Sequence, residues 1–295
     1  MNDKKVIAII DGDGLAYHSL RETLDESLEA LYSKFNNLLL KTQATHYYLF
    51  ISKGTYFRHE VMPEYKQKRS GRPRPTNLLT LKAVLQDKYN AAFLPHVEAD
   101  DLCAFFYNNF STKNFFGDKE EGEVILCSPD KDLLQGIPSL RSPRGHFNYS
   151  YSLLNENEEV VTGHWVTTTP EQAHRFFWES MIIGDPADNV PGIRKKGAKY
   201  VEKLFEGVEK TNVDYLQLVF FAYIAAYGEA GGITEFSRNY RALKLLSTVE
   251  DFVREVGHHY SPEERLECLE GSAIQKSDLV GYPRFSDSFL NDDNL

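Results

Sequence analysis

The first half of the chain alternates short apolar runs with longer stretches in which apolar residues recur at helical spacing. Residues 6–10 form a continuous branched run, which is typical of a strand buried on both faces. Similar runs predict three further strands, and the stretches between them predict helices. The strands are expected at 6–10, 46–51, 93–97 and 124–127, and the helices at 15–40, 78–89 and 101–110. This alternation predicts an α/β fold on a mainly parallel sheet with right-handed crossovers.

The pattern changes in the second half. Residues 147–169 are rich in Tyr, Asn, Glu and Thr, which predicts a hairpin or a surface excursion. Helical spacing returns at 170–183 and dominates from 213 onward, with a predicted break at 230–233. Residues 276–295 are polar and acidic, so we expect a flexible tail; docking of the tail on a replication partner is the alternative.

Bulk composition is that of an ordinary soluble protein. The chain has 295 residues, 42% of them hydrophobic, and no run approaches the ~18 apolar residues of a membrane span. Its start lacks the cleavage pattern of a signal peptide. We therefore expect a cytoplasmic monomer without membrane contact. Cys103, Cys127 and Cys268 are widely spaced, which fits reduced structural thiols and no metal site.

Positive charge is concentrated in two segments, although the net charge is -10. Residues 53–74 carry seven basic and two acidic residues, and residues 194–210 carry six basic and three acidic ones. In the second segment, Pro191 and Gly192 force a turn, and a helix is expected to begin near Gly197. A helix start beside lysines suits a phosphate group.

Acidic residues follow the predicted strands at the points where those strands end. Because ligands bind at the carboxyl ends of strands in such sheets, the side chains should converge on one edge. Clustered carboxylates need cations, and oxygen-only ligands favour Mg²⁺ or Mn²⁺. The candidates are Asp11, Asp13, Glu98, Asp100, Asp101, Asp130 and Asp132, with Asp185 and Asp188 later in the chain. Taken singly, each group also fits a turn or a helix cap.

Four blocks of sequence, in this order, resemble the flap-endonuclease-like 5′ nucleases, which include the nuclease domain of bacterial DNA polymerase I and phage replication exonucleases. The blocks are Ile-Ile-Asp-Gly-Asp at 9–13, the basic segment 57–69, Val-Glu-Ala-Asp-Asp at 97–101 with Ser-Pro-Asp-Lys-Asp at 128–132, and residues 183–192. The resemblance spans about residues 6–205. It implies a PIN-like nuclease core at 1–180 with a helical arch at 53–79, then a helix-turn-helix and helical region at 181–275.

The resemblance also implies roles for single residues. The nine acids would hold two Mg²⁺ ions, which Mn²⁺ could replace, and Lys66 and Arg69 would act on the scissile phosphate. Relatives often bind K⁺ in the helix-turn-helix loop, but Lys195 replaces the middle glycine of that motif, which disfavours K⁺ here. The residues expected to contact DNA are Arg58, Tyr65, Lys68 and Arg72 in the arch, and Gly192, Arg194, Lys195, Lys196, Gly197 and Lys199 in the turn.

One position departs from the family pattern. Relatives commonly carry an aspartate after the strand that precedes the arch, where this chain has Ser52. A serine cannot replace the charge of a carboxylate. Asp13, beside Asp11, is the candidate to compensate; otherwise one metal ion would be bound more weakly.

The function expected from the resemblance is a Mg²⁺-dependent 5′→3′ exonuclease and structure-specific flap endonuclease. It would act on DNA with 5′ ends, flaps or nicks, and on RNA-DNA hybrids during primer removal. Two alternatives remain open. A PIN-like ribonuclease would prefer RNA substrates, and a catalytically silent branched-DNA-binding module would bind without cleaving at any metal concentration.

Overall fold

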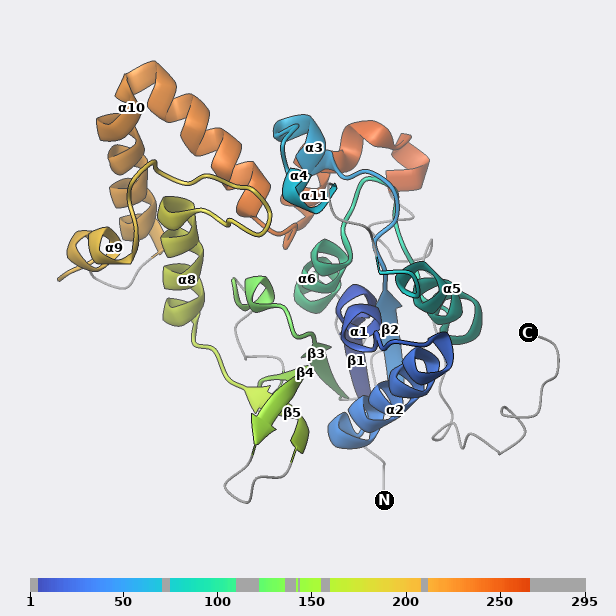
Figure 1. Ribbon diagram of the computed structural model, residues 1–295. Helices are drawn as coiled ribbons and strands as arrows, with labels where there is room; N and C mark the ends of the chain where they lie inside the picture. Colours follow the sequence, from blue (N-terminus) through green and yellow to red (C-terminus); the bar gives the residue numbers. More distant parts are fainter. Residues whose placement is uncertain are drawn as a thin grey trace.

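A five-stranded sheet in the order β2-β1-β3-β4-β5 forms the centre of the computed structural model (Figure 1). The structure describes residues 5–70, 75–109, 122–135, 142, 144–154, 160–207 and 212–265. Strands β1 to β4 run parallel, and β5 pairs antiparallel with β4. The expected mainly parallel α/β sheet is therefore confirmed. The strands are β1 (Lys5–Asp11), β2 (His46–Phe50), β3 (Gly122–Cys127), β4 (His146–Leu154) and β5 (Val160–Val166).

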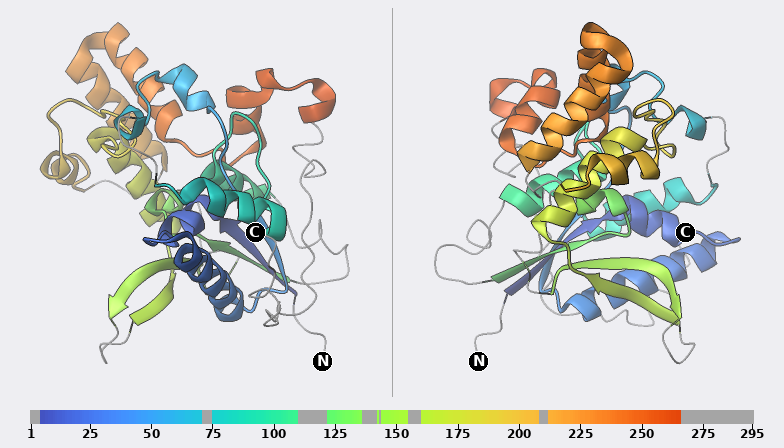
Figure 2. Two further views of the ribbon diagram at one scale, coloured as in Figure 1. Left: turned by 45° about the vertical axis from the view of Figure 1, so that its right-hand side comes forward. Right: turned by 90° about the vertical axis from the view of Figure 1, so that its left-hand side faces the viewer.

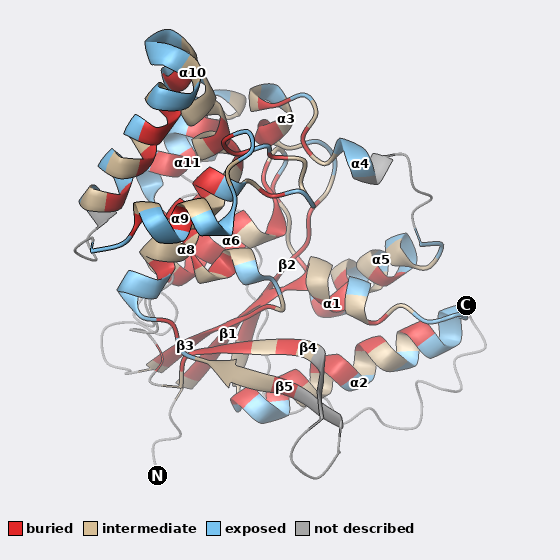
Figure 3. Cartoon of the chain, turned by 60° about the vertical axis from the view of Figure 1, so that its left-hand side comes forward, coloured by how far each residue is buried: buried red, intermediate tan, exposed pale blue. Residues whose placement is uncertain are grey.

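Helices cover both faces of the sheet (Figure 2). On one face, α1 (Gly12–His18), α2 (Leu24–Thr42) and α5 (Leu78–Tyr89) share a buried core with the side chains of Val6, Ala8 and Ile10. On the other face, α6 (Ala99–Asn109) and α11 (Val249–Val256) pack against Ile7 and Ile9. Figure 3 shows that β1 is buried between these layers, as its continuous apolar sequence predicts.

Two of the expected elements were wrong in detail. Residues 93–97 form no strand but only isolated bridges, because Pro95 has no N–H to donate and His96 has a left-handed φ of 63°. The single helix expected at 15–40 is two helices. The second begins at a capping box in which Thr23 and Glu26 satisfy each other's backbone N–H groups. The expected hairpin is confirmed as β4 and β5.

Helices after β5 form a separate core beside the sheet. They are α8 (Pro170–Ile183), α9 (Ala198–Leu204) and α10 (Asn212–Leu243), with the short α3 (Phe57–Val61) and α4 (Gln67–Ser70) of the basic segment 53–74 nearby. Single-turn helices η1 (Lys131–Leu134) and η3 (Gly257–His259) complete the described elements. Of the three cysteines, Cys103 and Cys127 are buried free thiols, and Cys268 lies outside the described residues, as does the tail at 276–295.

Helix α10 is long and apolar enough to span a membrane by length and composition alone. However, Gly228 has a φ of 75° and breaks it, so neither half reaches the about 20 residues that a span requires. The two halves fold onto each other at Gly232, where an added Cβ would lie 2.7 Å from the Cα of Ile224. The sequence predicts this break at 230–233, whereas the structure places it at Gly228.

A closed turn links α8 to the segment that leads into α9. We call residues 184–192 the acid turn. Asp185 and Val190 exchange backbone hydrogen bonds of 2.9 and 2.8 Å, which close it. Gly184 and Gly192 both have positive φ, and a Cβ on Gly192 would lie 2.4 Å from the backbone nitrogen of Gly184. Only glycine fits at these two positions, so the conformation of the turn is fixed by its sequence.

Candidate metal centre

The acids singled out in the sequence come together at the carboxyl edge of the sheet, as expected. Asp11 ends β1, Asp13 lies in the first turn of α1, and Asp130 precedes η1. Glu98 and Asp100 lie at the start of α6, and Asp132 lies in η1. The acid turn brings Asp185 and Asp188 from the helical region to the same place. Four separate segments of the chain therefore contribute carboxylates to one cluster.

The deepest acid is Asp11, whose side chain is tightly held. Its Oδ1 accepts hydrogen bonds from the backbone N–H groups of Asp13 (3.0 Å) and Gly14 (3.1 Å). Ser128 Oγ donates to Oδ2 over 2.9 Å. Burial, and then repulsion from Asp13 and Asp130, raise the pKa of Asp11 to about 7. A divalent cation would relieve this repulsion.

A second group of acids lines a small pocket. Asp100, Asp132, Asp185 and Asp188 border it together with Tyr65. Burial, followed by repulsion from Asp130, raises the pKa of Asp132 to about 6. Burial and the charge of Glu98 also raise the pKa of Asp100. Arg58 also lines the pocket, and the side-chain oxygens there come from the four carboxylates and the tyrosine. An oxygen-only ligand set of this kind fits a hard divalent ion.

Lysines balance the charge of the cluster from three directions. Lys66 Nζ is paired with Glu98 Oε1 and lies 3.5 Å from Asp188 Oδ2. Lys131 Nζ lies 3.5 Å from both Asp132 Oδ1 and Asp185 Oδ2. Lys82 Nζ lies 2.7 Å from Asp13 Oδ1. Although burial opposes it, the charges of Lys66 and Arg58 lower the pKa of Glu98 to about 2, so Glu98 is ionised.

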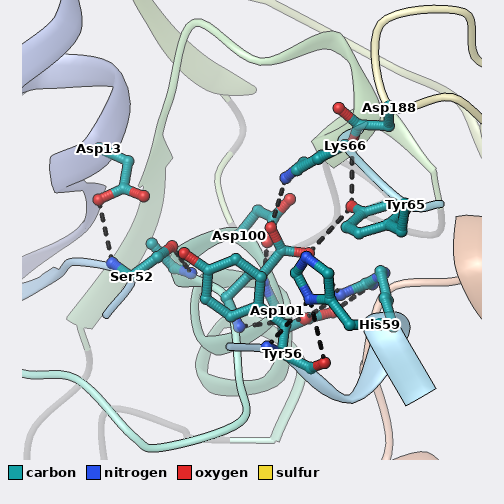
Figure 4. A network of polar contacts seen from close by, with 12 residues as sticks. Asp13, Ser52, Tyr56, His59, Tyr65, Lys66, Asp100, Asp101 and Asp188 are labelled. Carbon is teal, nitrogen blue, oxygen red and sulfur yellow. Dashed lines mark hydrogen bonds and ion pairs between the residues drawn. The ribbon is translucent and has the colours of Figure 1, made fainter. Parts of the chain in front are cut away.

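Three residues expected to contact DNA are placed elsewhere by the structure. Arg58 is buried and pairs with Asp101 through both terminal nitrogens, with Nη2 2.8 Å from Asp101 Oδ1. Tyr65 is buried, and its hydroxyl lies 2.9 Å from oxygens of both Glu98 and Asp188, so it is not free to stack on a base (Figure 4). The N–H of Gly192 is buried and donates to Asn239. These three expectations were wrong.

Asp101 also differs from the expectation of a metal ligand. Its oxygens lie within 4.8 Å of those of Glu98 and Asp100, as a ligand set requires. However, both accept hydrogen bonds from Arg58, and Oδ1 also accepts one from the N–H of Leu246. Asp101 is fully buried and anchors Arg58. The structure therefore favours a structural role for Asp101.

Ser52 lies beside Asp13, on the other side of the cluster from Asp188 (Figure 4). The Ser52 N–H donates to Asp13 Oδ1 over 3.0 Å, and Ser52 Oγ accepts from the N–H of Ala99 at the start of α6. The carboxylate of Asp13 thus stands next to Ser52, the position at which the resemblance implies an aspartate. The serine itself holds the helix that bears Glu98 and Asp100.

The remaining basic residues lie on the surface or outside the described residues. Arg194, Lys195, Gly197 and Lys199 are exposed, and the Lys196 ammonium lies 4.1 Å from the ring centre of Tyr200. Exposed Lys68 donates to the carbonyl of Pro186 over 3.3 Å. The side chain of Arg69 and all of Arg72 lie outside what the structure describes. The sequence did not predict that Ser128, Lys82 and Lys131 contact the acidic cluster. For Lys131 a signal was available, because it stands between two acids in the sequence.

We expect Mg²⁺ to raise the thermal unfolding midpoint more at pH 8 than at pH 6. The pKa values of Asp11, about 7, and Asp132, about 6, exceed the ordinary value of 3.8, so the folded protein retains protons that the unfolded chain loses. Their contribution to the free energy of unfolding is therefore lost as the pH rises from about 4 to 7. Mg²⁺ competes with these protons and binds better above that window. The measurement is calorimetry of the metal-free protein with and without Mg²⁺, and K⁺ at equal ionic strength is the control. Equal shifts of the unfolding midpoint at pH 6 and pH 8 would contradict the prediction.

Comparison with known proteins identifies the class. Residues 6–162 match the model of the 5'-3' exonuclease, N-terminal resolvase-like domain, and the chain belongs to this family. The resemblance found in the sequence is confirmed.

Individual relatives show the same similarity in sequence. The chain is 30% identical over 219 residues to the thermostable DNA polymerase I of Thermus aquaticus, covering 68% of this chain and 24% of that protein. It is 28% identical over 213 residues to a 5'-3' exonuclease of Aquifex aeolicus, covering 66% and 67% of the two chains. The chain thus spans about a quarter of the length of the polymerases it matches.

A solved structure shows a similar fold. The flap endonuclease of bacteriophage T5, crystallised as a pseudo-enzyme-product complex with DNA and metal ions, superimposes with a TM-score of 0.62 at 18% identity. The alignment covers 92% of this chain and 100% of the phage protein. The sheet and the helical region after it therefore belong to one known architecture.

Proposed function

We propose that the protein is a Mg²⁺-dependent 5′ nuclease that hydrolyses phosphodiester bonds near 5′ ends of DNA, both exonucleolytically and at flaps. The observation that carries this proposal is the convergence of carboxylates from four segments at one edge of the sheet, next to Lys66. Family membership supports it, and so does the name of the Aquifex aeolicus relative, a 5'-3' exonuclease. Removal of primers during replication is the cellular role that follows.

The chemistry follows from the donor set. Two divalent ions held by Asp11, Asp130, Asp132, Asp185 and Asp188, with Glu98 and Asp100 beside them, would lower the pKa of an attacking water and stabilise the charge that develops on the phosphate. Lys66 Nζ already lies against these acids and is ionised, because Glu98 and Asp188 raise its pKa. We propose that Lys66 also stabilises the scissile phosphate, assisted by Arg69.

The grip on duplex DNA is proposed for the surface that follows the acid turn. Arg194, Lys195 and Lys199 are exposed there, and Gly197 exposes backbone at the start of α9. Such contacts bind phosphates without reading sequence. Lys68 and the arch would face the 5′ strand. Asp13 would act as a metal ligand in place of the family aspartate, whose position is occupied by Ser52. K⁺ is not included in the proposal, since Lys195 stands where the family motif has its middle glycine.

The proposed arrangement has a nuclease core at 1–180, a duplex-binding helical region at 181–275 and a tail that could dock on a replication partner. We propose that the protein acts as a monomer in the cytoplasm, where its substrate is found. The separate hydrophobic core of the helices after β5 supports this division, and hydrogen bonds join the two regions. The N–H of Lys66 in the arch donates to the carbonyl of Asp188, and Asn189 Nδ2 donates to the carbonyl of Glu64.

The test is cleavage of end-labelled flapped, nicked, blunt and RNA-only substrates across a range of Mg²⁺ and Mn²⁺ concentrations. We expect products released from 5′ ends and flaps of DNA, with product length reporting polarity and mode. Preference for RNA-only substrates would instead indicate a PIN-like ribonuclease. Tight binding of branched DNA without cleavage at any metal concentration would indicate a silent binding module.

A further inference from the structure

Outside the acidic cluster, three residues from distant parts of the sequence bring side-chain ligand atoms together. Glu60 lies in α3, His96 lies in the segment before α6, and His259 lies in η3. Their oxygen and nitrogen atoms lie within 4.8 Å of one another. The rings of His96 and His259 stack face to face, with centroids 3.7 Å apart and planes 3° from parallel.

The backbone holds these side chains in place. His96 has a left-handed φ of 63°, which is uncommon for a residue with a side chain, and its carbonyl accepts a 2.9 Å hydrogen bond from the N–H of Phe57. The Tyr260 hydroxyl donates to the carbonyl of Pro95, which fixes η3 against the same segment. The strained position is thus stabilised from two sides, from α3 and from η3.

His259 is the residue whose side chain most clearly needs a partner. Its Nε2 lies 3.1 Å from Glu60 Oε1, yet it is buried and forms no aligned hydrogen bond among the described residues. A neutral imidazole offers one ring-nitrogen lone pair to a metal ion, and Nε2 of His259 points toward the carboxylate of Glu60. A buried nitrogen lone pair beside a carboxylate and a second imidazole is the arrangement that a transition-metal ion satisfies.

We propose that Glu60, His96 and His259 form a second metal site that takes an imidazole-preferring divalent ion of the Zn²⁺ class. Two imidazoles and one carboxylate select Zn²⁺, Ni²⁺ or Cu²⁺ over Mg²⁺, in contrast to the oxygen-only donors of the acidic cluster. Tetrahedral Zn²⁺ with Zn–N bonds of about 2.0–2.1 Å places its ligand atoms roughly 3.3 Å apart. Nε2 of His259 and Oε1 of Glu60 lie 3.1 Å apart, and one ligand atom of each residue lies within 4.8 Å of the other two. Because the two imidazole rings are parallel, one of them must rotate to direct both lone pairs at the same ion. Water takes the fourth position.

The position of the site gives the ion a structural consequence. Helix α3 begins the arch region, and the segment that contains His96 leads directly into Glu98. An ion here ties both to η3, near the C-terminal end of the described residues. We therefore expect it to restrict opening of the arch base without touching the scissile phosphate. The site does not depend on the proposed nuclease activity.

Zinc binding to the full-length, EDTA-stripped protein tests the proposal. Zn²⁺ is titrated in competition with a chromogenic chelator, with excess Mg²⁺ present to occupy the acidic cluster. The wild type is expected to bind one more equivalent of Zn²⁺ than His259→Ala or Glu60→Gln, with a loss of affinity of ~100-fold or more in each variant. His174→Ala, which removes a histidine of α8, should bind like the wild type. Asp130→Asn should also retain this equivalent, which separates the site from the acidic cluster.

Two further measurements distinguish the loss of a zinc ligand from a loss of the fold. Metal-free His259→Ala should unfold at the same midpoint as the metal-free wild type, and Zn²⁺ should slow amide exchange at residues 257–260 only in the wild type. If His259→Ala does not fold, the exposed Glu60→Gln decides the outcome alone. Equal zinc stoichiometry in wild type, His259→Ala and Glu60→Gln, or loss of the additional equivalent in Asp130→Asn, would overturn the proposal.

Discussion

Replacing Asp130 with asparagine should reduce cleavage of a 5′-flapped duplex by ~10³-fold or more while binding of that duplex persists. The charge of Asp130 raises the pKa of both Asp11 and Asp132, so it lies between the two groups of acids. An amide keeps the side chain's size but removes that charge. Metal ions contribute several kcal/mol to transition-state stabilisation, and each 1.36 kcal/mol is a factor of ten in rate.

The measurement is a single-turnover cleavage rate, paired with binding of the same flap in Ca²⁺. Asp130 Oδ1 accepts a hydrogen bond from the N–H of Asp132 over 2.8 Å, and the asparagine oxygen can still accept it. The local fold should therefore survive. Asp87→Asn, on the exposed side of α5, removes an equal charge away from the cluster and should cleave normally. Full activity of Asp130→Asn would defeat the metal assignment.

Arg58→Met should lower the free energy of unfolding by ~3–5 kcal/mol. Arg58 donates to Asp101 and Glu98, and also to the carbonyls of Ala242 and Lys244 over 2.8 and 3.0 Å. Methionine fills much of the space but leaves the fully buried carboxylate of Asp101 without its cation. The two carbonyls at the end of α10 also lose a donor. Urea denaturation of the metal-free protein measures the effect.

A double substitution separates the lost pairing from the lost packing. Arg58→Met with Asp101→Asn removes both charges, so it should be less destabilised than the sum of the two single variants. The coupling arises because the single variants each leave one buried charge unpaired. Additive effects would mean that Arg58 stabilises the fold through packing and the carbonyls of Ala242 and Lys244 instead.

Strong local patterns explain what the sequence could predict. The run at 6–10 and the acid directly after it lead to β1 and Asp11, since a continuous apolar run followed by Asp and Gly is typical of the end of a buried strand. The grouping of acids by strand ends also held, even though residues 93–97 are not a strand, because the segment is joined to the end of β2 by the bridge between Ala92 and Phe50.

Long-range pairing explains what the sequence could not predict. Arg58 lies in a basic segment, and its neighbours in sequence suggested DNA contact. Its actual partners are Asp101, 43 residues away, and carbonyls more than 180 residues away. Tyr65 is buried for the same reason, because the arch segment packs against Val190 and Ala242. Only the folded chain brings these groups together, so no local pattern could reveal their burial.

The acid turn has a consequence for how substrates of different shape can be handled. Asp185 and Asp188 are separated from the exposed residues 194–199 by a few residues of backbone, which internal hydrogen bonds and two obligatory glycines hold in one conformation. Under the proposed function, the fixed conformation of this short backbone segment sets the number of nucleotides between the gripped phosphates and the cleaved bond. That number should be the same at a flap, a nick and a recessed end. Selection among these substrates would then take place at the arch, before the DNA reaches the metal ions.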